Sequence, residues 1–272
     1  MTDARNARLA QAAASAAFAA IIGLFLLFMI LPTTRLLLSG AGSGLRLLGQ
    51  DRELRDALWL TLTCATAATL LTIIGGTPLA YVLARVQFPG RSVVAAAVDL
   101  PLLIPHPVAG IALLLALGRQ SVAGSLLQTI GTRVTGTAVG IVAAMTFVAA
   151  PLFVAAAREA FELVDARLEG VARTLGDSRY RAIRRVTLPL ASRGLLAAAI
   201  VMWARAASEF GAIVVLTYNP KVASVLSYDR FGASGLSGAL PVAAVLVLIA
   251  IVPLVALRTL QSRREPDERS NR

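Results

Sequence analysis

The sequence predicts an all-α membrane protein that crosses the bilayer six times. Of its 272 residues, 57% are hydrophobic and 15% are charged, and the mean hydropathy is +0.75, a composition that excludes an ordinary soluble domain. Six apolar stretches are long enough to be transmembrane helices, since roughly 20 helical residues cross about 30 Å of hydrocarbon. A helix is the expected form because it bonds its own backbone N–H and C=O groups where water is absent.

The predicted helices follow one another along the chain. Four stretches contain no charged residue, one contains only Asp99, and one contains Arg193, Arg205 and Glu209. In chain order, the stretches are residues 9–34, 57–84, 92–118, 134–157, 189–216 and 231–257. The first could be a signal peptide, but its apolar core is longer than the usual length of about 7–15 residues, so we expect a retained helix.

The distribution of basic residues predicts that both termini face the cytoplasm. With the N-terminus inside, sixteen of the 26 Lys and Arg residues lie in cytoplasmic segments and eight lie outside. Loops rich in Lys and Arg stay in the cytoplasm, so most of the net charge of +11 is a signal of membrane topology. We expect these basic residues to contact anionic lipid head groups rather than nucleic acid. The predicted organisation is an N-terminus at 1–8, a membrane domain at 9–260 with a cytoplasmic loop at 158–188, and a cytoplasmic tail at 261–272.

The residue types needed for catalysis are scarce. Cys64 is the only cysteine and His106 the only histidine, which argues against a zinc site and excludes an intrachain disulfide. Lys221, the only lysine, follows Asn219 and Pro220 rather than the glycine of a phosphate-binding loop. We therefore expect no catalytic residue, no metal and no cofactor, and any ATP hydrolysis must occur on a separate chain.

The loop at 158–188 has the pattern of an amphipathic helix. Twelve of its 31 residues are charged, but Phe161, Val164, Leu168, Val171 and Leu175 recur at steps of three and four, on one helical face. Such a face must lie on the helix bundle, the membrane surface or a partner protein.

The second half of this loop carries helix end signals. Gly176 stands where a glycine ends a helix, and Asp177 or Ser178 can cap a second short helix. That helix is expected to end before Pro189.

The run LEGVARTLGDSRYRAIRRVTLPLA, residues 168–191, resembles the EAA loop of ABC importer permease subunits. In that loop Glu-Ala-Ala is followed after three residues by Gly, and after nine more by an aliphatic residue, any residue, Leu and Pro. Gly176, Val186, Leu188 and Pro189 match this spacing. The departure is that 170–172 are Gly-Val-Ala, and that Glu169 lies one residue early.

The resemblance implies a type I ABC importer permease fold, in which this loop docks into a groove of a separate ATPase subunit. The residues that it assigns to ATPase coupling are Glu169, Gly170, Ala172, Gly176, Leu188 and Pro189. It also implies a homodimer in the prokaryotic plasma membrane, with two ATPase subunits on the cytoplasmic side and a solute-binding protein outside.

Two further stretches, 99–118 and 208–247, resemble the molybdate/tungstate branch of these permeases. The Glu-Phe-Gly-Ala element at 209–212 also resembles the sulfate/thiosulfate permeases. The resemblance thus implies import of a tetrahedral oxyanion, molybdate or tungstate. The alternatives are a sulfate or thiosulfate permease, a carrier that needs no ATPase, and a membrane scaffold.

Prolines within the third stretch mark a candidate solute pathway. Pro101, Pro105 and Pro107 cannot lie in an unbroken helix, because each lacks a donor N–H and crowds the carbonyl one turn back. The third helix must therefore be kinked or broken, either beside a cavity or as a purely structural feature. His106 lies at this break, as an oxyanion donor or as a structural group.

The fifth stretch contains two charges that are costly in a membrane. Arg205 and Glu209 are four residues apart on one helical face, so they can pair with each other. Alternatively, Arg205 offers an oxyanion a transient positive site and Glu209 keeps its binding weak. The predicted pathway residues are Pro105, His106, Arg205, Glu209 and Gly211.

Overall fold

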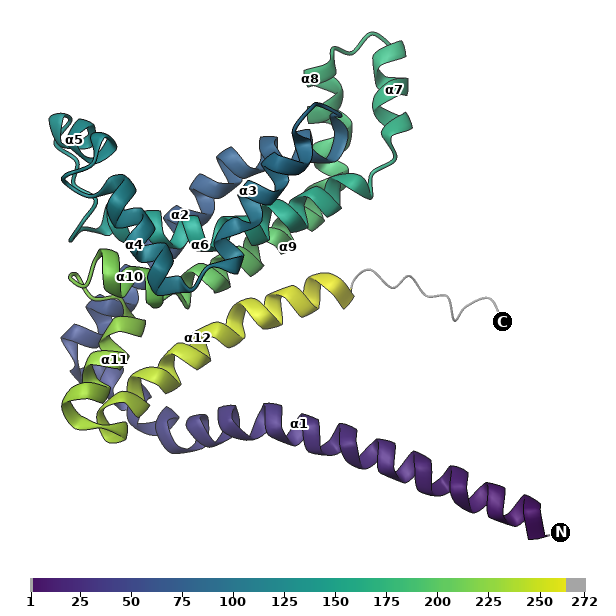
Figure 1. Cartoon of the computed structure of the whole chain (residues 1–272). Coiled ribbons are helices and arrows are strands. Elements are labelled where there is room, and N and C mark those ends of the chain that lie inside the picture. Colours follow the sequence, from purple (N-terminus) through teal and green to yellow (C-terminus); the bar gives the residue numbers. More distant parts are fainter. Residues whose placement is uncertain (1, 263–272) are drawn as a thin grey trace.

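The computed structural model describes residues 2–262, and within this range every regular element is a helix (Figure 1). The predicted tail at 261–272 lies outside the described residues from 263 onward. The helices are α1 (Thr2–Gln50), α2 (Arg52–Arg85), α3 (Arg91–Leu103), α4 (His106–Leu117), α5 (Val122–Thr129), α6 (Ala138–Glu162), α7 (Ala166–Thr174), α8 (Arg179–Ala182), the π-helical turn η1 (Ile183–Thr187), α9 (Leu188–Ala207), α10 (Gly211–Leu216), α11 (Ala223–Ser234) and α12 (Leu236–Ser262).

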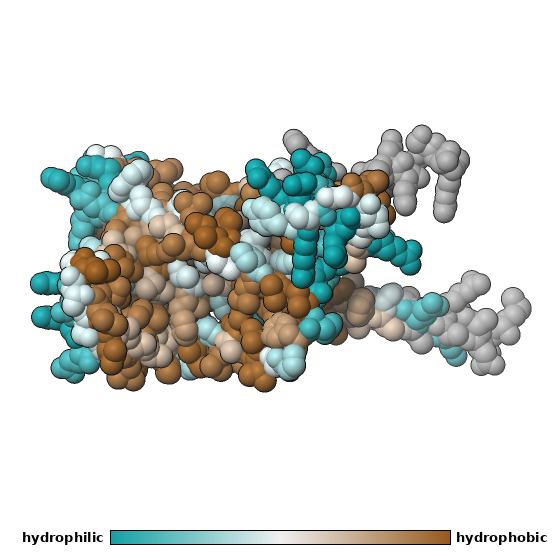
Figure 2. Space-filling view, turned by 90° about the horizontal axis from the view of Figure 1, so that it is seen from above, coloured by the Kyte–Doolittle hydropathy of each residue, from teal (hydrophilic) through white to brown (hydrophobic). Residues whose placement is uncertain are grey.

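Six membrane crossings fit this set of helices. Five helical segments in the described range are long and apolar enough to span a membrane, and the pair α3 and α4, bent by 118° at its break, is a sixth candidate span. The start of α1, the pair α7 and α8, and the end of α12 lie toward one side of the molecule, and α5 and α11 toward the other (Figure 1). Hydrophobic atoms cover the middle of the surface in Figure 2, with hydrophilic atoms gathered toward its two ends.

The core is built from α2, α6 and α9, which pack along one another. Small residues set their spacing. A Cβ on Gly76 of α2 would lie 3.0 Å from the ring of Phe153, and one on Gly194 of α9 would lie 2.5 Å from Cβ of Ala160. Close approach through glycine and alanine is how membrane helices gain dispersion energy, since burial from lipid supplies no hydrophobic drive.

The first helix is longer than the sequence predicts. It continues to Gln50, so Arg35 and Arg46 lie on a helix rather than in an external loop. Gly40 and Gly44, one turn apart, face α12, where added Cβ atoms would lie 2.7 Å from the carbonyl oxygen of Leu240 and 2.6 Å from that of Pro241. The glycine-rich run at 40–44 is thus a helix-packing face and does not end the helix.

Two other predicted boundaries shift because glycine and glutamate turn the chain. The fifth span starts at Arg179 and ends at Ala207 rather than at residue 216. The sixth starts at Leu236 rather than at residue 231, because Gly235 adopts φ +66° between α11 and α12. Residues 211–216 and 223–234 instead form the short helices α10 and α11.

Candidate functional site

The third span is broken at its proline cluster, as the sequence predicts. α3 ends at Leu103, Ile104 and Pro105 are extended, and α4 starts at His106 with Pro107 in its first turn. Pro107 is tolerated there because the first N–H groups of a helix have no partner inside it. The break therefore places His106 at the corner of a sharp bend.

A second break follows the fifth span. α9 ends at Ala207, and α10 starts at Gly211. Oε1 of Glu209 accepts a hydrogen bond from the backbone N–H of Ala212 at 2.8 Å, and the hydroxyl of Ser224 donates to the backbone carbonyl of Glu209 at 2.8 Å. The glutamate thereby fixes the turn into α10.

The two breaks meet through glycines. A Cβ on Gly211 would lie 2.6 Å from Cβ of His106, and one on Gly110 of α4 would lie 2.7 Å from the carbonyl oxygen of Ala212. Neither position has room for a larger residue. Gly110 is absent from the sequence prediction, because only the contact of α4 with α10 gives it a role.

Charged groups gather where the breaks meet, and they form one cluster. Nη2 of Arg205 donates to Oε2 of Glu209 at 2.8 Å, and Nε2 of His106 lies 3.7 Å from the same oxygen and in contact with Nη2 of Arg205. Glu209 is 2% exposed, Arg205 25% and His106 45%. The predicted pathway residues thus lie close together. The carboxylate of Glu209 is buried, whereas the side chains of Arg205 and His106 are partly exposed.

This arrangement can present hydrogen-bond donors to an anion. A guanidinium has five N–H groups and no acceptor, and the contacts of Arg205 with Glu209 and His106 both use Nη2. Within residues 2–262, Nε and Nη1 of Arg205 bond no other group and a quarter of the side chain is exposed, so these N–H groups are available as donors.

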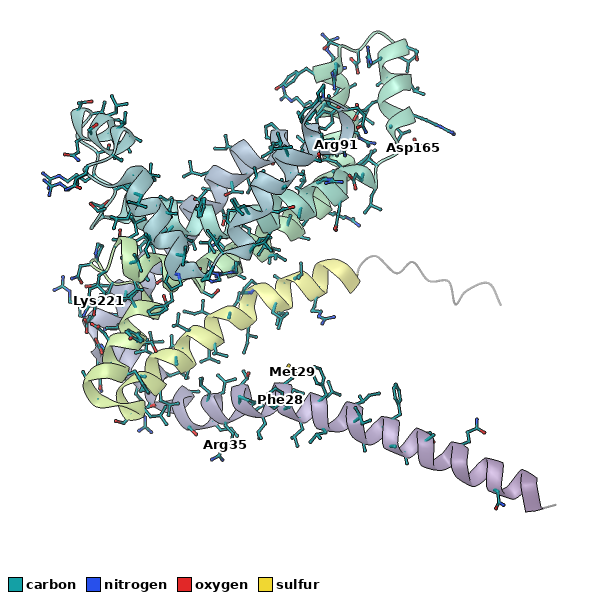
Figure 3. The ribbon with its side chains drawn as sticks, viewed as in Figure 1. Phe28, Met29, Arg35, Arg91, Asp165 and Lys221 are labelled. Carbon is teal, nitrogen blue, oxygen red and sulfur yellow. The ribbon has the colours of Figure 1, made fainter. Side chains whose placement is uncertain are left out.

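The loop at 158–188, the predicted coupling loop, lies apart from this cluster, at the end that carries α7 and α8. Figure 3 shows Arg91 and Asp165 at this end and Lys221 at the opposite one. Asp165 caps α7, its Oδ1 accepting from the backbone N–H of Arg167 at 2.9 Å. Gly176 ends α7 with φ +99°, and the backbone bonds from Gly176 to Arg173 and from Asp177 to Ala172 are the pair that defines a Schellman motif.

Two expectations about this loop are wrong. The apolar stripe does not lie on one helix, because α6 ends at Glu162: Phe161 and Val164 are buried in the core, whereas Leu168, Val171 and Leu175 are exposed. The helix that Ser178 caps also does not stop before Pro189. The π-helical turn at Ile183–Thr187 leads straight into α9, and its wider winding accommodates the proline near the start of α9.

The predicted coupling residues lie in two environments. Gly170 and Gly176 are exposed on the loop, Ala172 is partly covered, and Leu188 and Pro189 are exposed at the start of α9. Glu169 instead faces the helix bundle, with only 15% of its side chain exposed. Its partners are on α2 and η1, remote in the sequence, so no local pattern indicates them.

An ion-pair network holds the opposite end of the molecule together. Arg230 of α11 lies 2.6 Å from Asp51, between α1 and α2, and 3.1 Å from Glu53. Lys221 pairs with Asp229 and lies 3.7 Å from Glu53. Burial acts to raise the pKa of Asp51, but the N–H of Leu54 and the guanidinium of Arg230 outweigh it and hold that pKa below its ordinary value of 3.8.

Comparison with known proteins places the chain in a family. Residues 76–266 match the family described as "binding-protein-dependent transport system inner membrane component". The molybdate/tungstate transport system permease protein WtpB of Thermococcus kodakarensis is 43% identical over 214 residues, which are 79% of this chain and 81% of that protein. The probable sulfate transport system permease protein cysT of Chlorella vulgaris is 35% identical over 210 residues, 76% of this chain and 79% of that protein.

Solved structures show the same fold at low sequence identity. A bacterial alginate ABC transporter, in complex with a periplasmic protein bound to an alginate pentasaccharide, matches with a TM-score of 0.68 and 22% identity, covering 90% of this chain and 91% of its own. The MetNI methionine ABC transporter in an inward-facing conformation matches with a TM-score of 0.61 and 19% identity, covering 78% and 96%. The expected type I ABC importer fold is confirmed. The chain belongs to the family of binding-protein-dependent transport system inner membrane components.

Proposed function

We propose that the chain is the membrane-spanning permease subunit of an ATP-driven importer of molybdate or tungstate. The observation that carries the proposal is the 43% identity, over about four-fifths of both chains, to a relative named as a molybdate/tungstate permease. The cluster of His106, Arg205 and Glu209 supports an anionic solute, because its accessible groups are hydrogen-bond donors.

The proposed mechanism moves the solute by gating, without covalent chemistry. Arg205 and His106 offer donors to the oxyanion oxygens, while the carboxylate of Glu209 holds the guanidinium in place and offsets part of its charge. Partial neutralisation keeps binding weak, which suits a group that must release its ligand. High affinity is left to the solute-binding protein outside the membrane.

Two copies of the chain would enclose this pathway. His106 is 45% exposed on a single chain, so a solute bound there would face the lipid unless a second surface covered it. In a homodimer with the cluster at its interface, the second chain would shield the bound solute from lipid. With both termini in the cytoplasm, the loop that carries α7 faces two ATPase subunits and α11 faces the binding protein, in a prokaryotic plasma membrane.

The exposed face of α7 is the proposed ATPase docking surface. Leu168 and Val171 on α7, and Leu175 directly after it, are exposed apolar residues, and the helix carries basic groups as well. An ATPase subunit that covers them would convert its own closure into a displacement of α7, and the helix bundle would alternate between inward-facing and outward-facing states.

Co-purification and ATPase stimulation test the proposal. The chain, expressed with the ATPase and binding protein of its own source, is expected to purify with a stoichiometric ATPase whose hydrolysis rises when the binding protein carries molybdate or tungstate. Stimulation by the sulfate-loaded protein alone would favour a sulfate permease, for which the identity of 35% to cysT is the supporting observation. A chain that purifies without an ATPase would contradict the proposal.

A further inference from the structure

α7 is attached to the helix bundle by very little packing. The helix contains no buried residue. Beneath it, a groove of about 290 Å³ separates Leu168 from Leu190, Ala191 and Gly194 of α9. Apolar contacts therefore leave α7 free to shift relative to α9, and its attachment depends on other interactions.

Those interactions converge on Glu169. Oε2 of this residue accepts a hydrogen bond from the hydroxyl of Tyr81 on α2 at 2.9 Å, and Oε1 accepts one from the hydroxyl of Thr187 on η1 at 2.5 Å. Tyr81 and Thr187 are 8% and 0% exposed. Among the side-chain bonds of the described residues, those of Glu169 are the ones that join α7 to other helices.

Arg85 gives the carboxylate a second partner within reach. Its Nη2 donates to the backbone carbonyl of Val164, just before α7, and its Nε lies 3.9 Å from Oε1 of Glu169. Within residues 2–262 this Nε is buried and has no hydrogen-bond partner. A buried unpaired donor is costly, so a movement of α7 by about 1 Å toward Arg85 would gain a charge-assisted hydrogen bond.

We propose that Glu169 is a positioning residue, the pivot that transmits a displacement of α7 to α2 and to the π-helical turn. One carboxylate bonds both segments, so α7 cannot shift without pulling on Tyr81 and Thr187 together. The π-helical turn continues into α9, which ends at the cluster of Arg205 and Glu209. The inference rests on the proposed function, because it needs an ATPase that moves α7.

Removal of single hydroxyl groups tests this pivot in the assembled complex. Thr187→Val and Tyr81→Phe each delete one donor to Glu169, and Glu169→Gln removes the charge that both share. Thr187→Val and Tyr81→Phe are each expected to co-purify with the ATPase and to keep its basal hydrolysis. In these two variants and in Glu169→Gln, stimulation by molybdate-loaded binding protein is expected to fall at least about tenfold, the lower end of the effect of one lost hydrogen bond to a charged group. Thr187→Ser keeps the donor and is expected to retain the stimulation.

Controls separate the pivot from general damage. Thr63→Val also deletes a threonine hydroxyl, but the partners of that hydroxyl all lie on its own helix, α2, so stimulation should be unchanged. Normal stimulation in both Thr187→Val and Glu169→Gln would contradict the pivot role of Glu169 without contradicting the proposed importer function. Equal loss in Thr187→Val and Thr187→Ser would also overturn the pivot role, because the hydroxyl would then be irrelevant. Failure of the wild-type chain to bind an ATPase would instead contradict the proposed function.

Discussion

Arg205 and Glu209 keep a cation at membrane depth without exposing its counter-ion. Glu209 is 2% exposed and bonds both the guanidinium and the N–H of Ala212, whereas a quarter of Arg205 remains accessible. Removal of one partner of a buried ion pair leaves the other uncompensated, but removal of both is often tolerated. Stability and transport should therefore respond differently to single and double changes.

The double variant separates these roles. Arg205→Gln and Glu209→Gln are each expected to lower the free energy of unfolding by on the order of 2 kcal/mol, and the double variant should regain most of this loss. Because it lacks the guanidinium that is proposed to bind the solute, the double variant should still transport no molybdate. Thermal unfolding in detergent and uptake by proteoliposomes measure the two effects. A stable double variant that transports normally would remove Arg205 from the pathway.

Gly211 is where the two helix breaks touch. Its replacement by alanine places a Cβ 2.6 Å from Cβ of His106, so the breaks must separate, and a loss of about 1–3 kcal/mol in unfolding free energy is expected. Gly75→Ala on α2 is the matched control, because a Cβ there meets nothing within 4 Å and alanine favours the helix. Melting temperatures of both variants in one detergent provide the measurement, and equal values would contradict the close contact.

At the scale of elements, Gly176 sets the direction in which the chain leaves α7. Its φ of +99° is a conformation that β-branched residues resist, and its Schellman motif satisfies the last carbonyls of the helix. A change at this residue therefore acts on the backbone turn, since a Cβ would meet no atom within 4 Å.

Substitution of Gly176 should uncouple ATP hydrolysis from uptake. Gly176→Val is expected to reduce molybdate uptake about tenfold or more. Valine in this left-handed conformation costs roughly 1–2 kcal/mol, so the turn distorts and α7 is reoriented. Gly176→Asn is the control, since asparagine tolerates this conformation. Uptake and ATPase activity are measured on the same proteoliposomes. Coupled transport in Gly176→Val would contradict a mechanical role for the turn.

The sequence indicates most spans and the break in the third span, but it misses the break after α9 and the contacts between distant segments. Apolar length predicts the spans, and Pro105 predicts the bend of the third, because these are local properties. Glycines such as those at 40 and 44 are typical of loops in a sequence, yet here they allow α1 to pack closely on α12. The bond of Tyr81 to Glu169 joins residues 88 positions apart, which no periodicity reveals.

At the scale of the whole molecule, ion pairs at the end opposite α7 tie three segments together. Asp51, between α1 and α2, pairs with Arg230 on α11. The folded pKa of Asp51 lies below its ordinary value, so folding favours the ionised form. The stabilisation is therefore present above the unfolded pKa of about 3.8 and is lost as the pH falls through the lower folded value.

Acidification should expose this contribution. Between neutral pH and about pH 3, the wild-type chain should lose more thermal stability than Asp51→Asn, which lacks the titrating group. Asp56→Asn is the control, because the pair of Asp56 with Arg52 is exposed on both sides and contributes little. Unfolding curves across this range measure the difference. Parallel curves for wild type and Asp51→Asn would show that the Asp51 pair does not stabilise the fold.

Transport itself tests the central claim most directly. Proteoliposomes that contain the chain with its ATPase, with ATP sealed in on the α7 side and molybdate-loaded binding protein on the other, should accumulate molybdate on the ATP side. Omission of ATP or of the binding protein should abolish the accumulation. Uptake that proceeds without ATP, or that is driven by an ion gradient alone, would contradict an ATP-driven importer.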